Sequence, residues 1–365
     1  MKRSFILSLA IVMLFACMPC AFAASDFVID ANGVLTGYNG SSTSVVIPTG
    51  VTKIGKHVFS GNNTIKSVVI PAGVTMIDEL AFEACTSLVS VTLPASLTTL
   101  GYGAFYQCSA LETLELPAGV TAISPAAFSE CASLKTIALP EGVTDMGLGM
   151  FAGCVSLESI QLPSTLTGIG TGAFERCAAL KTLDIPSGVA TIGAQAFSGC
   201  RALESIRLPE SITTVKYRAF YGCDALYEVF LPDNITTVEA GVFSFNTAVK
   251  CMAGSVTENT LTTAEYAFNH IEIMELPESV EIIDAEAFEN VDAEYVIIPS
   301  GCEEIGARAF ADCSALVRVD IPATVTVIAT DAFSGSSRVV IYAPAGSFAE
   351  EYAEARGIAF RATAE

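Results

Sequence analysis

Apolar and polar positions recur along this chain with a period of 23 residues. The unit is clearest in the stretch PSTLTGIGTGAFERCAALKTLDI, residues 163–185, after which Pro186 begins the next copy. Its template is Pro-x-x-Val-x-x-Ile-Gly-x-x-Ala-Phe-x-x-Cys-x-x-Leu-x-x-Ile-x-Leu. A fixed period of about 20 to 50 residues is typical of solenoids, in which stacked coils bury one continuous core.

The proline and the phenylalanine of the template keep this spacing over nine successive copies. Prolines stand at 48, 71, 94, 117, 140, 163, 186, 209 and 232, and phenylalanines at 59, 82, 105, 128, 151, 174, 197, 220 and 243. After Phe243 the spacing falters, and it resumes with Phe268 and Pro277. We count about thirteen coils and expect a single elongated domain, with the phenylalanines buried in one file.

Each coil contains two short apolar segments separated by bends. Residues 88–93 alternate between apolar and polar side chains, which is typical of a strand with one buried side. Pro94 ends that strand because proline has no N–H to donate. A second apolar segment, residues 120–123 and their equivalents, follows the proline, and a frequent glycine after it allows another bend. We expect the Ala-Phe-x-x-Cys stretch to form a single helical turn.

Both ends of the array carry sequences that predict caps. In residues 24–47, Asn32-Gly33 between apolar positions predicts a capping hairpin in front of the array at 48–343. In residues 344–365, Ser347 can begin a helix that Gly357 ends, followed by a last short strand. Caps are expected because an open stack would expose unpaired backbone groups at its ends.

The template, the hairpin before it and the C-terminal YAPAGSFAEEYAEARGIAF together resemble the BspA-like leucine-rich-repeat family of bacterial surface and secreted proteins, from about residue 26 to 361. The resemblance implies a curved solenoid that binds host or neighbouring-cell macromolecules, without catalytic residues common to the family. We therefore expect a β-rich, α/β-type solenoid: a right-handed, leucine-rich-repeat-like stack with short parallel strands and helical turns. The chain departs from better-known leucine-rich repeats where those keep Asn or Cys after the strand, because it has Ser96, Gly119, Gly142, Thr165 and Gly188 there.

Residues 1–23 carry the features of an export signal. Lys2 and Arg3 precede a short apolar run, and Ala21-Phe22-Ala23 provides the small-x-small pattern that signal peptidase cleaves. A lipoprotein signal ending at Cys17 is the alternative, and it would anchor the chain by a lipid. No other stretch reaches the about 18 apolar residues of a membrane span. Loss of Lys2 and Arg3 changes the net charge from −21 to −23, which disfavours nucleic acid and anionic membranes as partners.

One template position, three residues after the phenylalanine, holds most of the cysteines. These are Cys85, Cys108, Cys131, Cys154, Cys177, Cys200, Cys223 and Cys313, while Asn62 and Asn246 take the position in two other coils. The interchange with Asn predicts a buried side chain that donates to a backbone carbonyl. Disulfides between neighbouring coils are the alternative in an exported chain. A metal site is disfavoured because His57 and His270 are isolated, and no cofactor is predicted.

The outward positions of the strands suggest where a partner would bind. One column alternates in charge through Glu112, Lys135, Glu158, Lys181 and Glu204, and it ends at Tyr227. The neighbouring column changes from Asp184 and Arg207 to Phe230. We predict that Tyr227 and Phe230 are exposed and lie beside Glu204 and Arg207 as a partner-binding site. The irregular residues 244–276 that follow are either a decayed repeat or a loop or bend that helps to shape this site.

These features favour an exported, non-enzymatic binding solenoid, adhesin-like, that engages a protein of a host or neighbouring cell surface or matrix through its strand face. One alternative is a structural spacer of the cell envelope, which would have no localised binding patch. The other is a hydrolase of extracellular polymers, which would require a pair of carboxylates in a cleft. No catalytic residue stands out in the sequence.

Overall fold

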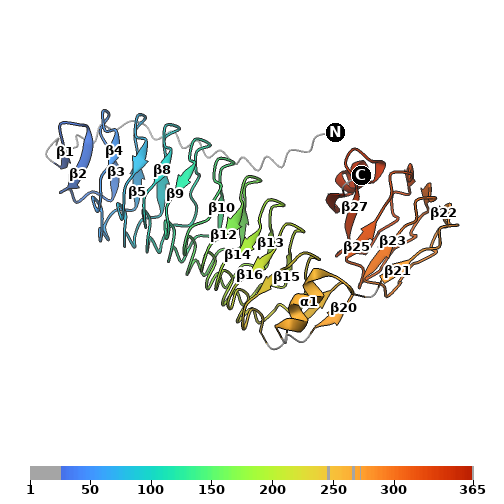
Figure 1. Ribbon diagram of the computed structural model, residues 1–365. Helices are drawn as coiled ribbons and strands as arrows, with labels where there is room; N and C mark the ends of the chain where they lie inside the picture. The colour runs from blue at the N-terminus through green and yellow to red at the C-terminus, as the bar shows by residue number, and fades with distance from the viewer. Residues whose placement is uncertain (1–25, 245–246, 265–267, 272, 364–365) are drawn as a thin grey trace. The chain divides into compact units, whose positions relative to one another are not determined.

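The computed structural model describes residues 26–244, 247–264, 268–271 and 273–363 (Figure 1), so the predicted export signal and Cys17 lie outside the described residues. The chain is a parallel-strand solenoid of about 14 turns, and its contacts divide it into two compact units. Unit 1 comprises Met1–Tyr227 and Thr237–Thr247, and unit 2 comprises Glu228–Thr236 and Ala248–Glu365. The sequence led us to expect one elongated domain, and the division into two units falls between Tyr227 and Ala248, close to where the regular period ends.

Unit 1 begins with a hairpin and continues as two rows of parallel strands. The antiparallel hairpin consists of β1 (Phe27–Ile29) and β2 (Val34–Tyr38), and β2 pairs with the first coil. The first row contains β3 (Ser44–Val46), β5 (Ser67–Val69), β7 (Ser90–Thr92), β10 (Thr136–Ala138), β11 (Ser159–Gln161), β13 (Thr182–Asp184) and β15 (Ser205–Arg207). The second row contains β4 (Lys53–Ile54), β6 (Met76–Ile77), β8 (Thr99–Leu100), β9 (Ala122–Ile123), β12 (Gly168–Ile169), β14 (Thr191–Ile192), β16 (Thr214–Val215) and β18 (Thr237–Val238).

The core of unit 1 follows directly from the template. Strands pair in register one period apart, as in Leu183 opposite Ile206. The phenylalanines from Phe59 to Phe243 stack in one file with ring centroids 4.9–6.0 Å apart and nearly parallel planes. Tyr38 of the hairpin packs on Phe59 at 5.3 Å and covers the first ring. The predicted file of buried phenylalanines is therefore present in unit 1.

The Ala-Phe-x-x-Cys stretch is a hydrogen-bonded ladder of turns and not the helical turn that the sequence predicts. The residues two before and two after the phenylalanine have positive φ, as in Leu80 (54°) and Ala84 (52°) around Phe82. The N–H of Phe82 donates to Ala104 of the next coil (2.9 Å), while the N–H of Glu83 donates back to Leu80 (3.2 Å). Left-handed residues interrupt a helix, so the backbone alternates between bonds inside the coil and bonds to its neighbour.

The buried cysteines of this ladder are free thiols. All ten described cysteines are unpaired and buried, so the structure supports the thiols and not the disulfides. The Sγ–H of Cys131 donates to the carbonyl of Phe105 in the preceding coil (3.2 Å), and Cys85 to Cys223 repeat this bond. In unit 2, Ser336 occupies the same template position and donates to Phe310 (2.7 Å). The predicted donor role is therefore present, and it does not require sulfur.

Unit 2 contains a short sheet with one helix, and then further coils with a second helix. The short sheet has β17 (Glu228–Phe230), β19 (Ala248–Cys251) and β20 (Asn269–His270), with α1 (Val256–Thr263) between the last two. The further coils form β21 (Ile273–Glu275), β23 (Tyr295–Ile297), β25 (Arg318–Asp320), β27 (Val340–Pro344) and β28 (Ala359–Thr363), and β22 (Ile282–Ile283), β24 (Glu304–Ile305) and β26 (Val327–Ile328). The second helix is α2 (Phe348–Arg356), and Tyr352 from it covers Phe333.

The segment around α1 has the same design as the C-terminal cap around α2. Both helices follow an Ala-Gly-Ser sequence, at 253–255 and 345–347. In both, the serine caps the helix and a glutamate three residues later accepts from the glycine N–H. Both then return to a parallel strand whose partner lies 19 residues earlier. The described parts of the irregular segment, residues 247–264 and 268–271, therefore share the strand–helix–strand arrangement of the C-terminal cap.

Candidate functional site

The strand face of unit 1, formed by the outward side chains of its first strand row, carries paired charges. Lys135 lies 3.2 Å from Glu112, and Lys181 lies 4.0 Å from Glu204. All four side chains are more than half exposed, so each pair contributes at most about 1 kcal/mol. The alternating charges therefore pair between neighbouring coils, as their spacing in the sequence indicates, and they add little to stability.

The predicted site residues are divided between the two units. Glu204 and Arg207 lie at either end of the β15 region, and Arg207 is opposite Asp184 in the register of β13 and β15. Tyr227 is 69% exposed at the end of the first segment of unit 1. Phe230 belongs to β17 of unit 2. The joint site of these four residues therefore stays a prediction.

Phe230 is half-buried, which corrects the expectation that both aromatic side chains are exposed. The Lys250 ammonium and the Arg338 guanidinium each lie 5.6 Å from the centre of its ring. Lys250 comes close because β19 pairs with β17 in parallel, with Phe230 opposite Lys250. These paired residues are 20 positions apart in the chain, in place of the usual 23. The template therefore does not predict that Lys250 lies beside Phe230.

A network of ion pairs surrounds Phe230 within unit 2. Lys250 contacts Glu228 (3.0 Å) and Glu294, and Arg338 also contacts Glu228. Burial acts to raise the pKa of Glu228, but the hydrogen bonds and charges of Arg338 and Lys250 outweigh it and lower that pKa. The Glu228 carboxylate is therefore held ionised between two cations.

A second cluster lies on strands β23, β25 and β27. The Arg318 guanidinium is stacked between Tyr295 (4.6 Å) and Tyr342 (4.1 Å) and binds Asp320 through two nitrogens at 2.7 and 3.0 Å. Tyr295 also donates to Asp320. Burial, followed by this hydrogen bond, raises the pKa of Tyr295. These residues are not among those that we predicted from the sequence, although outward tyrosines at Tyr295 and Tyr342 flank Arg318 in neighbouring coils.

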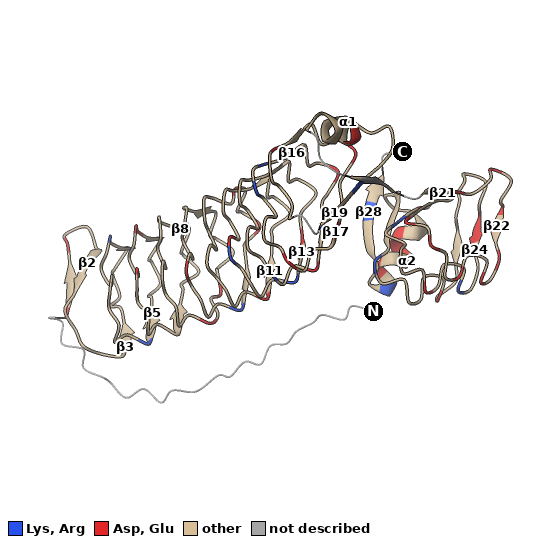
Figure 2. Cartoon of the chain, turned by 90° about the horizontal axis from the view of Figure 1, so that it is seen from below, with Lys and Arg blue, Asp and Glu red and all other residues tan. Residues whose placement is uncertain are grey.

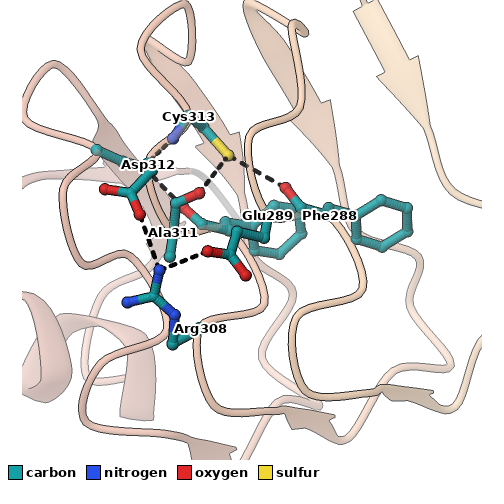
Figure 3. Close-up of polar contacts among 8 residues, drawn as sticks. Phe288, Glu289, Arg308, Ala311, Asp312 and Cys313 are labelled. Atoms are coloured by element: carbon teal, nitrogen blue, oxygen red, sulfur yellow. Dashed lines mark hydrogen bonds and ion pairs between the residues drawn. The ribbon is translucent and has the colours of Figure 1, made fainter.

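The turn face is the surface formed by the residues around each phenylalanine, and in unit 2 it carries a neutralised arginine. Figure 3 shows Arg308 between Glu289 of the preceding coil (2.5 Å) and Asp312 of its own coil (2.8 Å). Cys313 lies beside them and donates to Phe288 (3.2 Å). Arg308 is thus paired with two carboxylates, and we interpret it as a structural contact between neighbouring coils.

Neither a metal centre nor a membrane helix emerges from the described residues. In that part of the chain, no group of three or more His, Cys, Asp or Glu side chains is placed to hold a metal ion. No helix there is long and apolar enough to span a bilayer. The surfaces that remain are the strand face and the turn face.

Stacked coils with a strand row, a phenylalanine file and a ladder of turns define a leucine-rich-repeat solenoid. The model of the BspA type leucine rich repeat region, which contains six copies, matches residues 37–158, 144–270 and 254–349. The chain therefore belongs to this family, as its template suggests. No curated protein matches the chain.

Two solved structures are similar to this chain. A leucine-rich repeat protein from Bacteroides ovatus is 28% identical, with a TM-score of 0.54, over 88% of this chain and 84% of its own. A leucine rich cell surface protein from Faecalibacterium prausnitzii is also 28% identical, over 93% of this chain and 96% of its own, with a TM-score of 0.49. The first of these supports the solenoid fold.

Proposed function

We propose that this chain is an exported, non-enzymatic binding protein, adhesin-like, that engages a protein partner through its strand face. The observation that carries the proposal is Tyr227, whose ring is 69% exposed at the position where every preceding coil from Glu112 onward has a charged residue. Interfaces are enriched in exposed tyrosine and arginine, which contribute most of the binding energy when a partner covers them. Membership of a family that includes surface proteins supports the same function.

Glu204, Arg207, Tyr227 and Phe230 are the residues that we assign to this site. A pull-down with the mature chain against matrix proteins and extracts of neighbouring cells identifies the partner. The double change Tyr227→Ala and Phe230→Ala is then expected to weaken binding by about 2 kcal/mol or more. Thr92→Ala is the control because Thr92 occupies the template position of Phe230 in a distant coil of the array.

The single variants separate binding from stability. Phe230 is half-buried beneath Lys250 and Arg338, so Phe230→Ala is also expected to lower the melting temperature. Tyr227→Ala should weaken binding and leave the melting temperature unchanged, because its ring is mostly exposed. Equal binding by Tyr227→Ala and the wild type would favour the structural spacer instead.

Export rests on residues 1–23 and has its own test. We expect the secreted chain to begin at Ala24, which N-terminal sequencing of material from the culture medium checks. A membrane-bound product that becomes soluble on Cys17→Ser would instead establish the lipid anchor.

A further inference from the structure

Tyr217, Arg218 and Tyr221 form an exposed cluster on the turn face of unit 1. The Arg218 guanidinium carbon lies 5.0 Å from the centre of the Tyr217 ring and 4.9 Å from that of Tyr221. The two rings are 41% and 43% exposed, and Arg218 and the neighbouring Lys216 are exposed as well. The arginine is thus held in place by aromatic rings at the surface.

Arg218 occupies the same template position as Arg308 of unit 2, two residues before the phenylalanine. Both have a left-handed backbone, with φ of 53° and 54°. Arg308 is neutralised by Glu289, which follows the phenylalanine of the preceding coil, and by Asp312, two residues after its own phenylalanine (Figure 3). The coil of Arg308 therefore shows two places from which a carboxylate can neutralise an arginine at this position.

The two carboxylates are absent around Arg218. The residue equivalent to Glu289 is Ser198, and the residue equivalent to Asp312 is Gly222. Within the described part of the chain, neither Arg218 nor Lys216 forms an ion pair, although the chain as a whole is strongly acidic. Glu239 accepts a hydrogen bond from the Tyr217 N–H (2.8 Å), which fixes the backbone beside the cluster. Two small residues thus leave room next to an unneutralised guanidinium.

We propose that Lys216, Tyr217, Arg218 and Tyr221 form a docking point for an acidic peptide segment of a partner protein. Carboxylates of that segment take the places that Glu289 and Asp312 occupy around Arg308. Charge-assisted bonds from a guanidinium to carboxylates are strong and directional, and the two tyrosines add apolar contact area on either side. The net negative charge of the chain repels acidic proteins in general, so the attraction is local and falls with ionic strength.

The test uses the mature chain and a labelled peptide of alternating Glu and Gly, with the matched Gln–Gly peptide as reference. Fluorescence anisotropy at low salt is expected to show binding of the Glu peptide and none of the Gln peptide, and binding should weaken as salt rises. Arg218→Gln is expected to weaken it about tenfold or more. Equal binding of both peptides, no binding of the Glu peptide, or no effect of Arg218→Gln would overturn the proposal.

Ser198→Glu is the most specific test. It places a carboxylate beside Arg218 at the template position from which Glu289 neutralises Arg308. It should abolish peptide binding as Arg218→Gln does, with both tyrosines retained and the melting temperature unchanged. The control is Tyr102→Ala with Tyr106→Ala, at the same template positions in a coil that has Gly103 in place of the arginine. That control should bind normally, and unchanged binding by Ser198→Glu would contradict the proposal.

Two further measurements define the occupant and separate this site from the strand face. Polygalacturonate, an anionic polysaccharide, should compete poorly with the peptide, and equal competition would overturn the assignment to a peptide. Tyr227→Ala should bind the Glu peptide normally. The strand-face site and this docking point can therefore fail independently.

Discussion

At the residue scale, the cysteine of the template combines a small apolar side chain with a hydrogen-bond donor. Its thiol fills an interior turn and donates to the phenylalanine carbonyl one coil earlier, as Cys154 does to Phe128 (3.1 Å). That buried carbonyl also accepts from the N–H of Cys131 in its own coil (3.2 Å), so the thiol is its second donor. Serine performs the same task at Ser336, which explains why the position tolerates different polar side chains.

These thiols predict a characteristic loss of stability in alkali. Burial raises the pKa of Cys85, Cys154 and Cys223 from 9.0 to about 12. Because the folded pKa is raised, the folded state keeps its protons between pH 9 and 12 while the unfolded state releases them. The stabilisation is complete below pH 9 and is lost as pH rises, by about 1 kcal/mol per thiol at pH 10.

Denaturant unfolding at pH 8 and pH 10 measures this loss. Cys154→Ser should show a smaller difference between the two pH values than the wild type, because serine does not ionise there. A thiol-reactive reagent tests the redox state, because the described cysteines should react only after denaturation, with no reductant added. Rapid reaction in the native state, or several disulfides by mass spectrometry, would contradict the buried free thiols.

At the element scale, the strand–helix–strand arrangement occurs twice, around α1 and around α2. Ser255 and Ser347 each bind the N–H of a glutamate three residues later, and each helix follows a strand of the core. Within unit 2, Thr257 of α1 accepts from the N–H of Ile235 (2.9 Å) and donates to the carbonyl of Pro232. Such contacts satisfy the backbone groups that a coil presents where the stack ends.

The internal cap predicts that the chain can be shortened after β20. A fragment of residues 24–271 keeps α1 and should give a cooperative thermal transition by circular dichroism, at a lower temperature because it lacks Arg338 and Glu294. A fragment of residues 24–244 lacks α1, exposes the end of the stack and should aggregate. Identical behaviour of the two fragments would mean that α1 does not serve as a cap.

At the scale of the whole molecule, the two units differ in surface chemistry although they share one template. The strand face of unit 1 carries small and paired charged residues, whereas unit 2 carries stacked aromatic and arginine side chains. Between Lys250 and Arg308 the sequence contains no Lys or Arg, and acidic residues mark the coils around β22 and β24 (Figure 2). A regular core thus leaves the outward positions free to diverge.

Two units with separate phenylalanine files should unfold in separable steps. Phe128→Ala in unit 1 and Phe310→Ala in unit 2 each remove a fully buried ring and should cost about 3–5 kcal/mol. Calorimetry is expected to show two transitions, with each variant lowering only the one that belongs to its unit. A single transition that both variants lower equally would mean that the whole array unfolds as one cooperative body.

The amino-acid sequence by itself determined the coil, its period and its core. The positions of Pro163 and Phe174 repeat in every regular coil and that of Cys177 in most of them, and a contact that repeats with the period can be inferred from one copy. The family and the hairpin at Asn32-Gly33 followed from the same local patterns. The thiol donors followed as well, although Asn62, which takes the same position in the first coil, accepts hydrogen bonds from Thr64 and Ile65 through its amide oxygen.

Only the tertiary structure decided what depends on residues far apart in the chain or on backbone conformation. Leu80 and Ala84, on either side of Phe82, are not residue types that favour a left-handed backbone. They adopt it because hydrogen bonds to the next coil stabilise it. Phe230 is half-buried because Arg338, 108 residues away, lies over its ring. Arg218 and Arg308 look alike in the sequence, and their difference appears only when the preceding coil is stacked beside each of them, with Ser198 in one case and Glu289 in the other.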